Sequence, residues 1–595
     1  MDNMRSFLST IGFCIRLSWE SSRLYTVLRL FIYLTNAIIP LISIYASKVF
    51  IDILVQAGHV ARPFHEAVFW LIIICGITIS VAVTNRLLQY IQDIHIELMN
   101  NRIQVGLMEK SMSVDMDFFD SPDYIDSMQA TMMDSFALPN IVWNIFAGFS
   151  SLISFTSAFI MLGTVNWLYP LILTAAAFPS AISNQRYTKL LYGWRLSHIN
   201  EDRKMGYIQS LASNKTFAND IRLFNLREFL VGRYQDIWTL LIMGRKKLLK
   251  RQLFAALSAS LLPEAIIFII LILVTRNIFD GRNTVGDYTL YSGLLATLAG
   301  SLTYAINSIV NIYEDKLKVD TIKKFESRAN SVLDNGTKEL SGDLDIEFKD
   351  VSFKYPGTER LILNGLSFRI APKEKICLIG INGAGKSTII KLLLRFYDVS
   401  NGNIIINGND IREYSLSSLR RCFSTFFQQY DKYAFSLRDN VIISDLEKQA
   451  SDDKRAIETL EKVDALGLLK KAAKGLDTPL SRYFDPDGIE LSGGEEQKIA
   501  LARTVYRSCQ MIIFDEPSSS LDPISEMNLF ENMKELFKGK SALFTSHRLS
   551  IVHLSDHILI LEDGHITESG SHKELMELGG EYSKLYTLQS KKYEV

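Results

Sequence analysis

The chain has 595 residues, enough for several domains, and a formal net charge of −1 that gives no overall field favouring nucleic acid as a partner. Hydrophobic residues make up 48% of it and the mean hydropathy is positive, which is typical of a chain that lies half in a membrane. The five cysteines are scattered without a C-x-x-C pair, which argues against a disulfide framework or a cysteine metal site.

The first part of the chain contains apolar runs near the length that a membrane helix needs. The first run is too long for a signal peptide and lacks an A-x-A cleavage site, so we expect a true span there. Lys and Arg are abundant in residues 183–252, so we expect the basic connections and both termini to lie in the cytoplasm. The lipid bilayer of the cell membrane is an expected partner. We expect six spans, at residues 25–47, 67–84, 141–163, 167–182, 253–274 and 287–312.

An acid at membrane depth is costly and often lines a wet cavity. Glu264 follows Pro263 in the fifth expected span. It is a candidate for a cavity or cargo contact, with an interfacial carboxylate or a partner of the helix kink as the alternatives. Further candidates for the cavity are Asn36, Asn144, Asn307 and Tyr304.

A polar, charged stretch at 315–342 is the expected linker, and a strand-like alternation begins at Leu344. Just after it, Tyr355 can stack on a flat adenine ring, although a plain strand-end tyrosine is an alternative. We therefore expect a transmembrane domain over residues 1–328 and a nucleotide-binding domain over residues 329–595.

Residues 380–388 read GINGAGKST, a phosphate-binding loop of the form G-x-x-x-x-G-K-S. An apolar run precedes it and a helical pattern follows, which is the strand–loop–helix context that this motif requires. Backbone amides can wrap a phosphate there, Lys386 can reach the β- and γ-phosphates of ATP, and Ser387 can ligate Mg²⁺. The fold class is thus an α-helical six-span domain followed by an α/β P-loop domain. The expected nucleotide contacts are Gly380, Asn382, Gly383, Ala384, Gly385, Lys386, Ser387 and Thr388.

Two further motifs carry chemistry. The run Met511–Phe514 resembles a buried strand, and it ends in Asp515, suited to hold Mg²⁺, and Glu516, suited to act as the general base. Ser492, Gly493 and Gly494 begin a strong helical pattern, where a hydroxyl and bare amides offer either an anion site or a helix cap.

The order of these motifs resembles the ATP-binding cassette family, over the whole chain. The resemblance implies that Gln428 lies in a glutamine loop touching Mg²⁺ and the membrane domain. It implies that Asp522, in Ser-Ser-Leu-Asp, belongs to the D-loop, and that His547 is the switch histidine contacting the γ-phosphate. It also implies a head-to-tail dimer of cassettes, in which Ser492–Gly494 faces the ATP of a second copy or of a related chain.

Six spans followed by one cassette resemble a half-size exporter of the type IV fold. Two segments, 117–124 and 219–225, are similar to the coupling helices of such exporters. The sequence departs from the family at residues 485–488, where DPDG replaces the usual Gly-Glu-Arg-Gly, so Asp485 or Asp487 takes over the glutamate contact or that contact is lost.

Among half exporters the chain is most similar to bacterial lantibiotic and peptide exporters, in residues 428–433, 497–504 and 516–523. The expected cargo is a peptide or another small amphipathic substrate. Multidrug or lipid export is the alternative, as is a nucleotide-gated regulator on the same scaffold. The presence of both Glu516 and His547 favours turnover over gating.

Overall fold

Two compact units make up the chain in the computed structural model. One contains residues 1–113 and 126–328, and the other contains residues 114–125 and 329–595. The residues that the structure describes are 2–57, 64–120, 128, 131, 135–327, 330–446, 453–517, 536–546 and 549–590.

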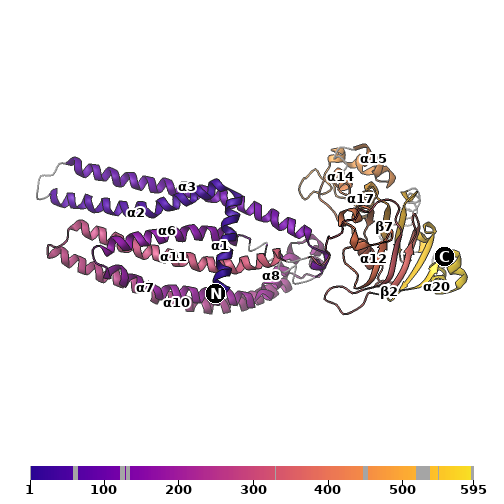
Figure 1. Ribbon diagram of the computed structural model, residues 1–595, viewed down its shortest axis with the longest axis horizontal. Coiled ribbons are helices and arrows are strands. Elements are labelled where there is room, and N and C mark those ends of the chain that lie inside the picture. Colours follow the sequence, from indigo (N-terminus) through magenta and orange to yellow (C-terminus); the bar gives the residue numbers. More distant parts are fainter. Residues whose placement is uncertain are drawn as a thin grey trace. The chain divides into compact units, whose positions relative to one another are not determined.

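The first unit is helical. Its elements are α1 (Asp2–Ser21), α2 (Arg23–Ala57), α3 (Phe64–Ser113), α6 (Ala137–Gly163), α7 (Leu168–Ser197), α8 (Ile199–Ser213), η1 (Lys215–Phe217), α9 (Ala218–Leu223), α10 (Arg227–Phe279) and α11 (Val285–Glu326). Figure 1 shows α2 beside α3, α6 beside α11 and α7 beside α10. Leu41, Leu162 and Leu295 belong to a buried cluster that joins α2, α6, α7, α10 and α11.

Among the described residues, five helices are long and apolar enough to cross a membrane: α2, α3, α6, α10 and most of α11. The expected fourth span, 167–182, lies in α7, which is not one of the five. After Pro179, α7 continues through Asn184, Gln185 and Arg186, which reduce its apolar character. A count of six spans is therefore not confirmed, although the helical character of this unit is.

Several helices continue far past their apolar stretch. The helix α10 has 53 residues, which at 1.5 Å per residue is roughly 80 Å, well over the ~30 Å of a hydrocarbon core. The helix α3, with 50 residues, likewise continues well past the thickness of the hydrocarbon core. The connections between the spans are thus largely continuations of the membrane helices.

The second unit is built on two sheets. Among the described residues, one sheet has the strand order β2-β1-β4-β5 and is antiparallel, and the other has the order β10-β9-β3-β8-β7-β6 and is parallel except for β10. The strands are β1 (Ile346–Phe353), β2 (Leu363–Ile370), β3 (Lys375–Ile379), β4 (Asn401–Ile406), β5 (Asn409–Asp410), β6 (Phe423–Phe426), β7 (Met511–Asp515), β8 (Ser541–Ser546), β9 (His557–Glu562) and β10 (His565–Gly570).

The helices of this unit cover both sheets. They are α4 (Met116–Phe119), α12 (Lys386–Leu393), η2 (Ile411–Glu413), α13 (Leu416–Arg421), α14 (Leu437–Ile442), α15 (Asp453–Lys462), α16 (Gly467–Lys471), η3 (Gly475–Asp477), α17 (Gly493–Tyr506), η4 (Leu549–Leu554), α19 (His572–Leu578) and α20 (Glu581–Ser590).

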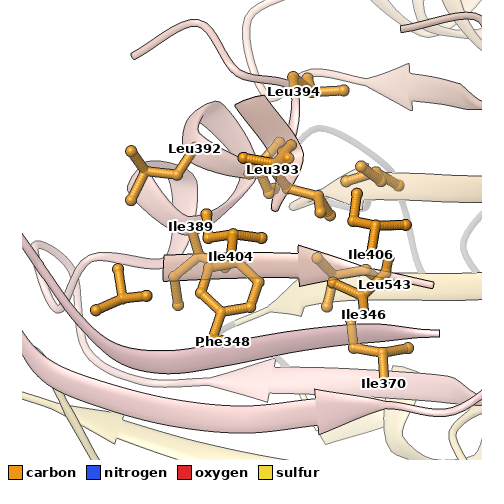
Figure 2. Close-up of a cluster of buried hydrophobic side chains, with 14 of the residues drawn as sticks. Ile346, Phe348, Ile370, Ile389, Leu392, Leu393, Leu394, Ile404, Ile406 and Leu543 are labelled. Carbon is orange, nitrogen blue, oxygen red and sulfur yellow. The ribbon is translucent and has the colours of Figure 1, made fainter. Parts of the chain in front are cut away.

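The helix α12 is anchored by its apolar face. Figure 2 shows Ile389 and Leu393 of α12 gathered with Phe348 of β1, Ile404 of β4 and Leu543 of β8. All five side chains are at most 1% exposed. Burying each stabilises the fold by about 1.5–3 kcal/mol, so the start of α12 is held firmly against both sheets.

Candidate nucleotide-binding site

The phosphate-binding loop runs from the end of β3 to the start of α12, as the sequence predicts. A Cβ at Gly380 would lie 2.4 Å from the carbonyl oxygen of Leu561, and one at Gly385 would lie 2.7 Å from a methyl carbon of Leu363. Gly385 also has φ of +109°, a backbone conformation that side chains rarely adopt. Glycine is therefore required at both ends of the loop.

The rest of the loop is arranged around these two glycines. Asn382 and Gly383 are exposed, and Gly383 has φ of +85°. Ala384 is buried, and its N–H donates to the carbonyl of Ile381 at 3.2 Å. The exposed backbone at the middle of the loop is the part that can meet a ligand.

Lys386 is buried at the centre of the site, with 6% of its side chain exposed. Its ammonium donates to the carbonyl of Gly380 at 2.7 Å and lies 3.7 Å from Glu516 Oε1. A buried cation beside one carboxylate and the loop suits binding of a multiply charged anion.

Asp515 ends β7 within reach of two hydroxyls. Ser387 Oγ donates to Asp515 Oδ1 at 3.2 Å, and Thr545 Oγ1 of β8 donates to the same oxygen at 2.5 Å. Burial raises the pKa of the Asp515 carboxyl, while these two hydroxyls oppose that shift. The pairing of Ser387 with Asp515 is the one expected of two residues that share a metal ion.

Glu516 follows in a strained conformation, with φ of +50° for a residue that has a Cβ. Its N–H donates to the carbonyl of Thr545 at 3.1 Å, which fixes the turn. Its Oε2 accepts from Gln428 Nε2 at 2.9 Å. The structure thus brings Gln428, Lys386, Ser387, Asp515 and Glu516 together, although Gln428 precedes Glu516 by 88 residues.

Tyr355 lies beside the loop. Its hydroxyl is 3.1 Å from Thr388 Oγ1, and its ring makes edge contacts with Phe353 and Tyr397. Lys391 Nζ lies 5.1 Å from the ring centroid. Thr388, expected to contact nucleotide, is buried with its hydroxyl against that of Tyr355.

Ser492 is the N-cap of α17, and its side chain forms a capping box with Glu495. Ser492 N–H and Oγ donate to Glu495 Oε2 at 2.9 and 3.0 Å. Ser492 therefore does cap the helix. Lys471, which forms a salt bridge with Glu495, is the main cause that lowers the pKa of Glu495. Gly493 and Gly494 would meet nothing within 4 Å of an added Cβ, so there is open space beside the start of α17.

Two expected site residues, Asp522 and His547, lie outside the described residues.

Asp485 and Asp487 both pair with Lys474, at 3.2 and 3.4 Å. The Asp487 N–H, and then Lys474, lower the pKa of Asp485.

The candidate cavity residues of the helical unit have varied surroundings. Glu264 is exposed in the single chain, as is Tyr304. The three asparagines form hydrogen bonds between helices: Asn36 with Asn85 and Thr84, Asn144 with Asn311, and Asn307 with Asn184. These asparagines therefore tie helices together.

Sequence reasoning missed three contributors. Thr545 supports both acids, yet a threonine in an apolar strand carries no visible signal. Tyr397 donates to Asp120 of the first expected coupling segment, so the described part of that segment packs on the cassette unit of this chain. Asp117 of the same segment lines a cavity with Tyr355. Residues 121–124 lie outside the described residues.

Two family models match the chain. The model described as ABC transporter matches residues 363–519, and the one described as ABC transporter transmembrane region matches residues 25–302.

Among curated relatives, the subtilin transport ATP-binding protein SpaT of Bacillus subtilis is 27% identical over 92% of this chain and 89% of its own length. An ATP-dependent lipid A-core flippase of Pectobacterium atrosepticum is 28% identical over 73% of this chain and 74% of its own. The solved structure of a bacterial Atm1-family ABC exporter with ATP bound has the same fold, with a TM-score of 0.80 at 20% identity, covering 94% of this chain and 98% of that chain.

Proposed function

The chain belongs to the ATP-binding cassette transporters, as a half-transporter of the exporter type that couples ATP hydrolysis to transport, and from that premise we propose that it exports a peptide across the cell membrane as a homodimer. The single observation that carries the catalytic part of the proposal is the cluster of Lys386, Ser387, Asp515, Glu516 and Gln428.

Each member of the cluster has a role in ATP hydrolysis. Lys386 neutralises the β- and γ-phosphates, and the backbone of residues 380–387 wraps them. Glu516 takes the proton of the attacking water, and Gln428 orients its carboxylate through the 2.9 Å hydrogen bond. His547 contacts the γ-phosphate in this proposal, and Tyr355 stacks on the base.

The donor set fits Mg²⁺, which prefers oxygen ligands and takes one or two protein groups alongside phosphate oxygens. Ser387 Oγ and Asp515 Oδ1 are 3.2 Å apart, and Gln428 donates its amide N–H to the neighbouring Glu516, which leaves its amide oxygen as an acceptor for the ion. Those residues would hold the ion. When bound, Mg²⁺ offsets the negative charge of the phosphates during transfer to water.

The start of α17 at Gly493 and Gly494 has open space beside it that suits a second anion site. Because Lys386 already serves the phosphate site of this chain, we infer that this second site binds a phosphate from another cassette. In this proposal, Gly493, Gly494 and Ser492 meet the ATP of the partner cassette, with Asp522 beside it. A single cassette per chain then requires a dimer, of two identical copies or of this chain with a related one.

The proposal keeps the domain boundaries at 1–328 and 329–595 and places both termini in the cytoplasm. The excess of Lys and Arg in residues 183–252 supports this orientation.

A peptide is the favoured cargo because the relative named for subtilin transport aligns over 92% of this chain. Lipid export is the second candidate, since the lipid A-core flippases align at 28% identity over 73% of this chain and at 38% over 43% of it. A nucleotide-gated regulator is disfavoured because the sequence contains both Glu516 and His547, the groups that turnover requires.

ATPase stimulation in lipid nanodiscs tests the cargo. We expect the ATPase rate to rise with a cationic, lantibiotic-like peptide and to stay flat with lipid A or with a neutral peptide of equal length. Stimulation by lipid A alone would replace peptide export with lipid export. Stimulation by neither would exclude both classes.

A further inference from the structure

One face of α11 carries amide and hydroxyl groups within the part of the helix that is apolar enough to cross a membrane. Its members recur at steps of three and four residues, which places them on one side of an α-helix. They are exposed or half-buried in the single chain, whereas Leu295 and Leu298 on the opposite side are fully buried. This face, the α11 stripe, consists of Thr297, Gly300, Tyr304, Asn307 and Asn311. Polar groups are costly against lipid, so the stripe suits a polar ligand.

The two asparagines of the α11 stripe join neighbouring helices and still keep unused hydrogen-bonding capacity. An asparagine side chain offers two N–H donors and two acceptor lone pairs. Asn307 Oδ1 accepts from Asn184 Nδ2 of α7 at 3.4 Å, and Asn311 Nδ2 donates to Asn144 Oδ1 of α6 at 3.4 Å. Among the described residues, these are the only hydrogen bonds of the two side chains. Each asparagine of the stripe therefore keeps at least one donor and one acceptor.

The unused groups of the α11 stripe are accessible. Asn311 is exposed, and Tyr304 is 69% exposed. Nδ2 of Asn307 keeps accessible surface, because in the described part of the chain the buried polar atoms that have no partner belong to other residues. A Cβ at Gly300 would meet nothing within 4 Å, which leaves open space beside the stripe. A ligand can therefore lie along this face of α11.

The spacing of the two asparagines matches the repeat of an extended peptide. Four residues of an α-helix rise about 6 Å, which separates Asn307 from Asn311 along the axis. In an extended chain, alternate residues point their N–H and C=O to the same edge, and two residues span about 6.7 Å. One amide side chain can donate to the C=O and accept from the N–H of one such residue. Two amides about 6 Å apart therefore fit residues i and i+2 of an extended peptide.

We propose that the α11 stripe binds the backbone of the transported peptide, which Asn307 and Asn311 hold in an extended conformation. The inference rests on the proposed function, which supplies a peptide as the cargo. Backbone groups are the same in every peptide, so recognition of this kind accepts peptides with different side chains. A lipid has no regular repeat of N–H and C=O groups, so the stripe favours a peptide over a lipid. In the proposed orientation, Asn311 lies at the cytoplasmic end of the span, where the cargo enters.

The test measures binding of a fluorescein-labelled probe, ten residues of alternating lysine and valine, to the full-length protein in phosphatidylcholine nanodiscs. A second probe carries a methyl group on every backbone nitrogen, which keeps its side chains and charge and removes its N–H donors. One hydrogen bond corresponds to about a fivefold change in affinity. We expect the wild type to bind the methylated probe about 25-fold more weakly, since each asparagine loses one donor. This ratio should fall to about five in Asn307→Leu or Asn311→Leu and to one in the double variant.

Asn184→Leu is the matched control, because it breaks the hydrogen bond to Asn307 from α7 and leaves the Asn307 amide in place. It should keep the wild-type ratio. A ratio that falls as far in Asn184→Leu as in Asn307→Leu would show that the bond between helices matters, and it would overturn the proposal. A wild-type ratio of one would overturn it without any variant. Asn307→Ala and Asn311→Ala serve if the leucine variants do not fold, with the same expected ratios.

Two further outcomes separate this inference from the proposed function. If the unmethylated probe neither binds the wild type nor raises its ATPase rate, peptide export itself fails and the inference fails with it. If that probe binds and stimulates while the ratio is the same in the wild type and in the double variant, only the role of the stripe fails. Conversion of the dimer to a monomer in the double variant, with an unchanged ratio, would assign the stripe to contact between two copies and would also refute the proposal.

Discussion

Thr545→Val tests whether the two acids of the site depend on a residue that touches no nucleotide. Valine has nearly the shape of threonine, and Thr545 is fully buried in β8, so the substitution removes a hydroxyl without opening a cavity. The hydroxyl donates to Asp515 Oδ1 at 2.5 Å and lies 3.2 Å from the N–H of Glu516. Its loss therefore acts on Asp515 and Glu516 together.

The magnitude follows from the partners that remain. A hydrogen bond to a charged group contributes about 1.5–3 kcal/mol. In the variant, Asp515 still accepts a hydrogen bond from the Ser387 hydroxyl, and the Glu516 N–H still donates to the carbonyl of residue 545. The substitution therefore removes one hydrogen bond to Asp515 and leaves neither acid without a partner. We expect the cassette to lose about 2 kcal/mol of stability and the ATPase rate to fall roughly 10- to 100-fold, as for other residues that support a metal ligand.

The assay is ATPase activity of the purified protein at saturating Mg²⁺ and ATP, alongside a thermal melt. Thr545→Ser should recover most of the rate because it keeps the hydroxyl. Thr459→Val is the control, since the Thr459 hydroxyl donates only to the carbonyl of Arg455 in its own helix, and it should lower stability without changing the rate. A Thr545→Val protein that hydrolyses ATP at the wild-type rate would refute the reasoning.

Three further predictions concern the expected site residues. Glu516→Gln should keep ATP binding but stop turnover, because an amide is no base, and ATP-bound dimers should accumulate; a wild-type rate would remove Glu516 as the general base. Lys386→Ala should weaken ATP binding to the isolated cassette, whereas Ser492→Ala should spare it and impair dimer closure, which gel filtration with ATP detects; an equal loss of binding would argue against a composite site. Glu264→Ala should leave the basal ATPase nearly intact and abolish stimulation by a cationic peptide if Glu264 lines the cargo path, and unchanged stimulation would exclude it.

The sequence predicted those features that depend on local pattern. The strand–loop–helix around Lys386 forms where glycine spacing and apolar runs place it, because both signals are contained in about twenty residues. The helical unit and the α/β cassette follow from the change of apolar period near Leu344.

The remaining features arise from contacts between distant segments. Thr545 and Tyr397 gain their roles only when β8 packs beside β7 and when α4 packs on the cassette unit, and the residues beside them in the sequence give no signal of these contacts. The fourth expected span shows the opposite limit, since the polar residues after Pro179 leave α7 short of the composition of its neighbours. Ser492 shows a third limit of sequence-based prediction. One hydroxyl can both cap a helix and bind an anion, and the same sequence pattern is compatible with either role.

Accumulation of a labelled cationic peptide in inverted membrane vesicles tests the central claim most directly. An ATP-driven peptide exporter should concentrate the peptide inside such vesicles when ATP and Mg²⁺ are supplied. Vesicles given ADP, or vesicles containing the Glu516→Gln protein, should not exceed passive equilibrium. Equal peptide levels with ATP and with ADP, in vesicles whose wild-type protein hydrolyses ATP, would contradict the account.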